Sequence, residues 1–549
     1  MPTAFQVKEQ AVTDTPLLLF DCQLQGNQSE RWSTHQVTVA GTTYQARVVQ
    51  HNLYEIQTSS DQGVDAIPKI SISLANADSH FSELERSVGF KGALLTVSFV
   101  FFDLKAGNPT TATITLFKGI FNPPDEITES TFRVTAVNRM NMQRVLLPQI
   151  RIQRRCPWEF PSTLAQRQEA VSGAASGQYS RFYRCGYSPD MPGGAGNLNG
   201  TVPYTSCAFT RTDCQARGMF QTDNAHNATH RFGGIEFVPS SILVRSYGEQ
   251  GRHWTPVLDN IARYNDFVPL IYGTAWYSPN IVFARNDGNL TRMEVLLGAG
   301  EINNVIKVLV NGIDIPEGRA GANMTGTGWF NLFSAGTRAG GFNLDFTDAQ
   351  GNPLGDPYGS MAALSVVVPN RINNGSSLPT IQVLLEGLKL ATYSADGTFV
   401  SEQFTKNPAW ILLDILRKCG WDISEIDLSS FTTVATYADQ QIGTQDLHGN
   451  TITIPRFECN LALVSRRTAA DLIRGVRNAC RLYLTYGNSG LLQLNVENTF
   501  ALQQPVKPDW SNSTSSFNSG WPSYEFGDGS SGISGIARDN KGASTIRVT

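Results

Sequence analysis

The stretch KISISL at Lys69–Leu74 alternates polar residues with isoleucine and leucine at every second position. Because successive side chains of a strand point to opposite faces of a sheet, this period of two predicts a β-strand with one buried face. Further runs rich in β-branched and aromatic residues predict strands at residues 94–102, 112–120 and 131–137.

A hairpin is expected earlier in the chain, where Ala40-Gly41-Thr42 separates the strand-like residues 35–39 and 43–48. Short strands separated by turn residues are typical of a β-barrel or a β-sandwich. No helix of convincing length is expected in this part. We therefore predict an N-terminal β-rich hub domain over residues 1–147.

The second half of the chain also favours β-structure. Residues 306–315 read as two strands around Asn311-Gly312, a tight hairpin turn. The glycine-rich residues 318–359 predict long loops. Other strands are expected at residues 268–273, 281–284, 292–297 and 381–390. These runs predict a second β-rich hub domain over residues 248–400.

Two helices are expected in an α+β hub domain over residues 401–500. Asn407 can cap the first, and Pro408 suits its first turn. Thr468 opens the second with a sequence close to a capping box. A hairpin within residues 481–496 follows. The whole chain is thus expected to be mainly β, with several barrel or sandwich domains, an α+β hub and a loop-rich segment.

Two features favour contacts with other chains. Charged residues make up 16% of the sequence, well under the typical value of about 25%. That composition suits a surface largely covered in an assembly. Residues 501–549 are rich in serine, glycine and asparagine and are expected to be extended. Their strand-like end, residues 544–549, could pair with another chain.

Charge and hydropathy argue against two other kinds of partner. The formal net charge is −4 and no basic face is evident, so sequence-specific binding of nucleic acid is not indicated. The longest apolar run, residues 93–102, is broken by Thr96 and Ser98 and is far shorter than the ~20 residues of a membrane helix. We expect no membrane anchor.

Four cysteines crowd into the middle of the chain: Cys156, Cys185, Cys207 and Cys214. Thiolates are soft ligands, and four of them suit an iron–sulfur cluster or a tetrahedral zinc ion. Their gaps fit neither a zinc finger nor a ferredoxin. Four buried free thiols, or two disulfides, are the alternatives. The surrounding segment has few aliphatic residues, so we expect a cross-link to hold a cysteine-rich domain over residues 148–247.

Other polar residues of this segment have two readings. Arg151, Arg154 and Arg155 could compensate the negative charge of a thiolate-bound cluster, or could cover a solvated surface strand. His226 and His230 are four residues apart and could hold a metal ion on a helix. We expect them instead to be loop residues near a site that already has four sulfurs.

A resemblance to a known family supports the cluster. The run Cys156–Trp158, the later Cys185, and the pair Cys207 and Cys214 resemble the tail tip protein L of lambda-like siphophages and the hub proteins of gene transfer agents. Arg231–Gly234, with the sequence RFGG, is similar to the motif that follows the last cysteine there. In that family four cysteines hold an iron–sulfur cluster. The resemblance implies the same role for these four cysteines, with a cluster of the 4Fe-4S type.

Later stretches resemble a second hub protein. Residues 268–273, 407–420 and 468–496 are similar to the N-terminal hub region of the lambda tail tip protein J. The strand-rich residues 1–150 are similar to the N-terminal β-domain of the L-type proteins. The chain therefore looks like an L-type half joined to part of a J-type hub.

The resemblance implies a structural role at the tip of a long, non-contractile phage tail. Such baseplate hubs are homotrimers that close the tail tube and open for DNA ejection, when genome DNA passes through the lumen. Their partners are the distal tail protein ring, the tape measure protein and central fibre or receptor-binding proteins. A closed ring satisfies the same interface on every subunit. The implied location is the tail tip of the virion, after assembly in the host cytoplasm.

We expect no enzymatic activity. The sequence has no Gly-rich phosphate loop, no nucleophile elbow and no HExxH zinc motif. A redox enzyme with an iron–sulfur cluster is one alternative. A glycan-binding or wall-degrading tail protein is another, with paired carboxylates such as Asp125, Glu126 and Glu129. Those three are more simply read as solvated loop residues.

Overall fold

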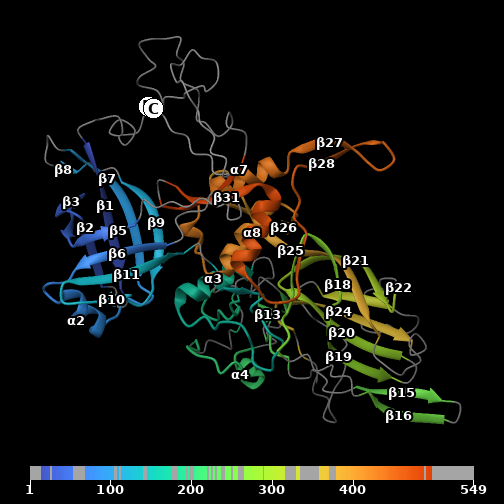
Figure 1. Cartoon of the computed structure of the whole chain (residues 1–549). Coiled ribbons are helices and arrows are strands. Elements are labelled where there is room, and N and C mark those ends of the chain that lie inside the picture. The colour runs from blue at the N-terminus through green and yellow to red at the C-terminus, as the bar shows by residue number, and fades with distance from the viewer. Residues whose placement is uncertain are drawn as a thin grey trace.

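The structure is a computed structural model. It describes residues 14–24, 28–52, 69–103, 108–109, 113–139, 142, 145–174, 183–192, 194, 196, 203–218, 222–223, 227–228, 232–235, 242–248, 251–257, 265–287, 290–315, 329–333, 356, 358–369, 379–487 and 490–497. The fold is mainly β, with several sheets and few helices, which confirms the fold class predicted from the sequence (Figure 1). The expected strand at residues 544–549 lies outside the described residues.

One large sheet takes up the first part of the chain. Its strand order is β3-β4-β2-β1-β7-β9-β11-β6-β5, with β10 on β11 and β8 on β7. The strands are β1 (Asp14–Gln23), β2 (Ser29–Ser33), β3 (Val37–Val39), β4 (Thr42–Ala46), β5 (Val48–His51), β6 (Lys69–Ala75), β7 (Leu94–Asp103), β8 (Asn108–Pro109), β9 (Ile114–Phe121), β10 (Glu126–Ile127) and β11 (Thr131–Asn138).

This sheet closes on itself at Arg47. β4 pairs with β2, and β5, which continues directly from β4, pairs with β6. The Arg47 N–H donates to the Ser33 carbonyl at 3.1 Å, and the Arg47 carbonyl accepts from the Ala75 N–H at 2.7 Å. β4, next to the β3 end of the strand order, and β5, at the other end, therefore meet at Arg47, and the sheet forms a barrel.

Aromatic side chains fill the barrel. Trp32, Phe90, Phe117 and Phe132 are fully buried and pack on one another. Phe81 joins them from the short helix α2 (His80–Ser87). The sequence analysis predicted no helix of convincing length here. α2 was missed because it is short and buries only two of its side chains.

The alternation in the opening stretch is confirmed in the barrel. In β6 the residues alternate between buried and partly exposed positions, so Ile70, Ile72 and Leu74 face the interior. The predicted hairpin is also present, because β3 and β4 pair around a turn in which Ala40 and Gly41 both have positive φ. Two such residues are typical of a type I′ hairpin turn.

The second half of the chain holds smaller sheets. One has the order β18-β25-β21-β22 with β26 on β25, and another has the order β19-β20-β24-β23. Their strands are β18 (Thr274–Tyr277), β19 (Asn280–Asp287), β20 (Leu290–Ala299), β21 (Ile302–Val310), β22 (Ile313–Ile315), β23 (Trp329–Phe333), β24 (Met361–Pro369), β25 (Ile381–Tyr393) and β26 (Phe399–Phe404). β23 lies in the glycine-rich stretch for which only loops were expected.

Three helices pack beside these sheets: α6 (Pro408–Lys418), α7 (Leu428–Ala438) and α8 (Ala469–Cys480). The predicted caps are confirmed, because Asn407 accepts from the Ala409 N–H and Thr468 from the Asp471 N–H. α7 was not predicted. After α8 comes the expected hairpin of β31 (Leu482–Tyr486) and β32 (Leu492–Val496).

Short elements make up the rest. They are β12 (Leu146–Leu147), α3 (Leu164–Ala174), α4 (Arg211–Ala216), β13 (Thr222–Asp223), β14 (Asn227–Ala228), β15 (Ile242–Gly248), β16 (Gly251–Val257), β17 (Leu270–Tyr272), the 3-10 turn η4 (Ile423–Glu425), β27 (Gln441–Gln445), β28 (Thr451–Pro455), β29 (Leu461–Leu463) and β30 (Arg467–Thr468). Within the described ranges, no helix is both long and apolar enough to cross a membrane.

One apolar core connects the later sheets, the three helices and part of the cysteine segment. Its members run from Met142 to Leu494 and include Trp158 and Ile235 of the cysteine segment. That segment therefore packs on the core of the later sheets and helices. The domain boundaries given above remain predictions.

Candidate functional site

Cys156 contacts two segments that come later in the chain, at Phe209 and at Gly233. Its N–H donates to the Phe209 carbonyl at 2.9 Å, and its sulfur accepts from the Gly233 N–H at 3.4 Å. The next turn of chain is fixed by Trp158, which is fully buried and donates from Nε1 to the Gly359 carbonyl at 3.1 Å. These contacts hold the Cys156 sulfur against residues that come much later in the chain.

Cys185 reaches the same region through a short backbone pairing. The Glu159 N–H donates to the Tyr183 carbonyl at 2.6 Å, and the Cys185 N–H donates to the Glu159 carbonyl at 2.7 Å. The Tyr183 ring stacks on Trp158, with the planes 4° apart. Cys185 is thereby placed beside the turn that carries Cys156.

Cys207 and Cys214 lie at either side of a helix start. The Cys207 sulfur accepts from the Phe209 N–H at 3.3 Å. Thr210 caps α4 by accepting from the Asp213 N–H, and Cys214 is buried on that helix. Phe209, the residue whose carbonyl holds Cys156, thus also fixes Cys207.

Cys156 has the other three predicted ligands in its neighbourhood, but the four thiols do not form a cluster. Cys214 and Cys156 pack with the buried Phe232 in one small apolar cluster. Burial, together with the nearby Cys185 and Cys207 thiols, raises the pKa of the Cys156 thiol to about 12. All four are free thiols in this structure, so the alternative of two disulfides is not formed.

These neighbouring thiols do not amount to a single-ion site. Among the residues that the structure describes, no three histidine, cysteine or acidic side chains are grouped so that they could hold one metal ion. The assignment of Cys156, Cys185, Cys207 and Cys214 as ligands stays a prediction.

Two glycines after the last cysteine allow the close packing. A Cβ on Gly233 would lie 2.3 Å from the Trp158 Nε1 atom, and one on Gly234 would lie 2.4 Å from the Arg154 carbonyl oxygen. Neither position accepts a side chain without movement of its neighbours. Close packing therefore explains why the RFGG stretch has glycine at both of its last positions. Arg231 lies outside the described residues.

Two of the three arginines predicted near the site stack on aromatic rings. Arg155 stacks on the Phe209 ring at 4.7 Å, and Arg151 stacks on Phe267 at 4.7 Å. The structure adds Arg217, which donates to the Ser206 carbonyl and lowers the pKa of the Cys207 thiol, although burial raises that pKa overall to about 11. Sequence reasoning missed Arg217, whose only signal was its place three residues after Cys214. His226 and His230 lie outside the described residues.

A buried polar network adjoins the cysteine segment. The Tyr272 hydroxyl donates to Asp414 Oδ2 at 2.7 Å, and Lys418 Nζ lies 3.3 Å from Asp414 Oδ1. The Lys418 ammonium also faces the Tyr183 ring at 5.6 Å. Nothing in the sequence marked these residues, because Asp414 and Lys418 sit on a helix of which almost every residue is buried.

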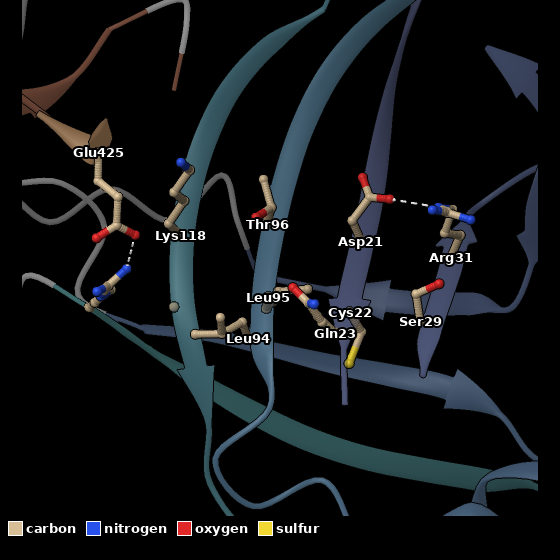
Figure 2. Close-up of a pocket in the computed structure, with 12 residues that line it drawn as sticks. Asp21, Cys22, Gln23, Ser29, Arg31, Leu94, Leu95, Thr96, Lys118 and Glu425 are labelled. Carbon is tan, nitrogen blue, oxygen red and sulfur yellow. Dashed lines mark hydrogen bonds and ion pairs between the residues drawn. The ribbon is translucent and has the colours of Figure 1, made fainter. Parts of the chain in front are cut away.

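A hollow lies between the barrel and η4. It has a volume of about 450 Å³ and is lined by residues of β1, β2, β7 and β9 together with Arg139 and Glu425 (Figure 2). Asp21 pairs with Arg31 at 3.2 Å, and Glu425 pairs with Arg139, whose guanidinium also stacks on Trp421 at 4.6 Å. These contacts tie the barrel to the segment after α6.

The comparisons with known proteins are sparse. Neither a family model nor a curated protein matches the sequence. Among solved structures, the chain is similar to one chain of the virion of a native gene transfer agent particle, at 12% identity and a TM-score of 0.22. The match covers 29% of this chain and 52% of that one, so this chain spans about half of its length. A match at this level carries no argument about fold or function.

Proposed function

We propose that this chain is a structural component of the tail tip hub of a phage-like particle, with an iron–sulfur cluster held by Cys156, Cys185, Cys207 and Cys214. The observation that supports it is the neighbourhood of Cys156, where Cys214 packs with Phe232 and the Cys185 and Cys207 thiols are close enough to raise the Cys156 pKa. The order of the sequence motifs along the chain supports the assignment to a hub.

Two features favour a cluster over a single zinc ion. Zinc holds its thiolates at about 2.3 Å, which needs all four sulfurs around one point. A cluster places several irons and sulfides between the cysteines, so its ligands stand farther apart. In addition, the sulfurs of Cys156 and Cys207 already accept backbone N–H groups from Gly233 and Phe209. Hydrogen bonds to sulfur are a feature of protein iron–sulfur sites.

The proposed role of the cluster is a cross-link. The loops that carry Cys185 and Cys207 have few buried aliphatic residues of their own. Metal-binding energy becomes folding energy when the metal-free segment has no core. The cluster would therefore fix the segment between the barrel and the later sheets.

Anaerobic purification tests the cofactor. The protein should be brown, with a broad absorbance near ~400 nm and stoichiometric iron and sulfide. Cys207→Ser should lose iron and leave residues 150–245 open to protease. Cys459→Ser is the matched control, because Cys459 is a partly buried thiol of the helical part. Stoichiometric zinc without sulfide would contradict the cluster.

The proposed assembly is a homotrimer at the tail tip, in contact with the distal tail protein ring, the tape measure protein and the central fibre. It would act without enzymatic activity and let genome DNA pass through its lumen. Because phosphate contacts would slow passage, we expect weak or no DNA binding at physiological salt. Immunogold labelling of virions should mark the tail tip. Labelling of the head, or tight sequence-specific DNA binding, would contradict the role.

A further inference from the structure

The hairpin of β27 and β28 stands apart from the rest of the fold. It extends outward beyond α7 (Figure 1), and every residue of β27 and the first four of β28 are exposed. We call residues 440–456 the arm. An isolated two-stranded hairpin is marginally stable in water at best. The order of the arm must therefore come from its root, its turn and whatever covers it.

The root of the arm is clamped to α7. The Arg456 N–H donates to the Gln440 carbonyl at 2.9 Å, and the Arg456 guanidinium stacks on the Tyr437 ring at 4.5 Å. One residue on, the Phe457 N–H donates to the Ala438 carbonyl at 3.1 Å. These contacts fix the direction in which the arm leaves the helix.

The tip of the arm is a closed turn. Asp446 Oδ1 accepts from the His448 and Asn450 N–H groups, each at 2.8 Å, and the Asp446 N–H donates to the Asn450 carbonyl at 2.9 Å. Gly449 takes the positive φ that the turn needs. The turn holds Leu447 outward with an exposed fraction of 103%. A single exposed leucine is ordinary, but Leu447 adds to the apolar surface of the arm, and contiguous apolar surface marks an interaction site.

One face of the arm is apolar. Ile442 lies opposite Ile454, and Ile452 lies opposite Thr444, so the three isoleucines share one face of the ribbon. The opposite face carries Thr453 and glutamines. The only acidic or basic residue between positions 441 and 455, histidine aside, is Asp446, which the turn uses. The face therefore fits an uncharged, apolar surface.

The same chain presents such a surface on the outer face of β18, β25 and β21. A groove of about 330 Å³ is lined by Trp276, Tyr277, Ser278, Leu309 and Gln382. None of these side chains is charged, and the exposed Lys307–Asp314 ion pair borders the groove beside Leu309. Leu309 and Gln382 are cross-strand partners, and the Trp276 side chain is 48% exposed. Exposed tryptophan in an apolar groove is a common anchor of protein interfaces.

We propose that the arm of one copy of this chain docks its isoleucine face and Leu447 on the Trp276 groove of a second copy. Among the described residues of one chain both surfaces stay exposed, and the clamped root holds the arm in its outward direction. A stable interface buries about 1,200–2,000 Å² in total, more than one short ribbon can supply. Arm docking must therefore be one part of a larger contact between copies, and in a closed ring each copy gives one arm and receives one. The docking is argued from the arm and the groove, and only the expected number of copies in the ring rests on the proposed function.

Cross-linking between labelled copies tests the docking. The photoreactive residue p-benzoylphenylalanine is placed at position 447 of the full chain, and unlabelled and ¹⁵N-labelled proteins are mixed before irradiation. We expect cross-links from position 447 to peptides that contain Trp276 or Gln382, joining light to heavy chains. Cross-links confined to single chains, or to other surfaces, would overturn the proposal.

A matched pair of variants measures the contribution of the face. Ile454→Asp should weaken association at least about tenfold, because it places a charge in an apolar contact. Thr453→Asp changes the adjacent residue on the opposite face and should shift association less than about twofold. Sedimentation velocity over a concentration series gives both values. Equal effects, or a wild-type chain that stays monomeric, would reject the docking. Iron assayed on the same samples separates this outcome from failure of the proposed cluster.

Discussion

Replacement of Asp414 by asparagine should destabilise the helical part of the fold. Asp414 and Lys418 lie one turn apart on α6, and both side chains are buried. The carboxylate also accepts from the Tyr272 hydroxyl at 2.7 Å. Asparagine has nearly the same shape, but it leaves the Lys418 amine facing a neutral amide in a site with little water.

The size of the effect follows from this geometry. Removal of one partner of a buried ion pair costs about 3–5 kcal/mol, because the other charge stays buried. The double variant Asp414→Leu with Lys418→Met should recover most of that loss, since apolar replacement of both partners is often neutral or stabilising. What remains is the unpaired Tyr272 hydroxyl, at about 1–3 kcal/mol, which Tyr272→Phe should remove.

Hydrogen exchange of the α6 peptides, followed by mass spectrometry, measures the local free energy of opening. Lys307→Met is the control, because Lys307 and Asp314 form an exposed pair at 3.0 Å whose loss should cost under about 1 kcal/mol. The reasoning is refuted if Asp414→Asn changes exchange no more than the control does. It is also refuted if the double variant opens as readily as the single one.

Further predictions concern the cysteine segment and α7. Gly233→Ala would place a Cβ 2.3 Å from the Trp158 Nε1 atom, so we expect a loss of about 1–3 kcal/mol and faster proteolysis of residues 150–245. Gly443→Ala, with no atom within 4 Å of its Cβ, should be neutral in the same assay. Burial alone would raise the pKa of Asp427, but hydrogen bonds, led by that from Ser429, lower it overall. Its cap on α7 is therefore fully present above the unfolded pKa of about 3.9 and is lost as pH falls further, through the depressed folded pKa. Exchange of the α7 amides should rise over that acid range, and Asp427→Ala, which should cost about 1 kcal/mol, should remove the pH dependence.

The parts of the fold that could be predicted are those with local causes. Polar and apolar residues alternate along residues 69–74 because one face of the barrel wall is solvent-exposed and the other packs on the core. That pattern is visible in the sequence of the strand itself. The caps at Asn407 and Thr468 are satisfied within three residues of themselves. α7 was missed because its sequence, LSSFTTVATYA, is rich in serine and threonine, which are weak helix formers. Burial of Phe431 and Val434 against the core outweighs that preference.

Barrel closure and the placement of Cys156 depend on distant residues, and the sequence shows neither directly. The parallel pairing of β2 with β4 and the double role of Arg47 have no local signal. In the candidate site, the sequence marked all four cysteines and the two glycines. It could not show that Phe209 holds both Cys156 and Cys207, because that contact joins two loops far apart in the chain.

The closure at Arg47 also bears on how the first part of the chain would withstand mechanical load. An open sheet can be unzipped one hydrogen bond at a time from its outermost strand. In the described part of this wall, β1, β7, β9, β11 and β6 each have a strand on both sides. A pull along any of them loads two ladders in shear, so many bonds must break together. The barrel would thus resist extension, and a force that stretches the chain would first extend the segments that connect the barrel to its neighbours.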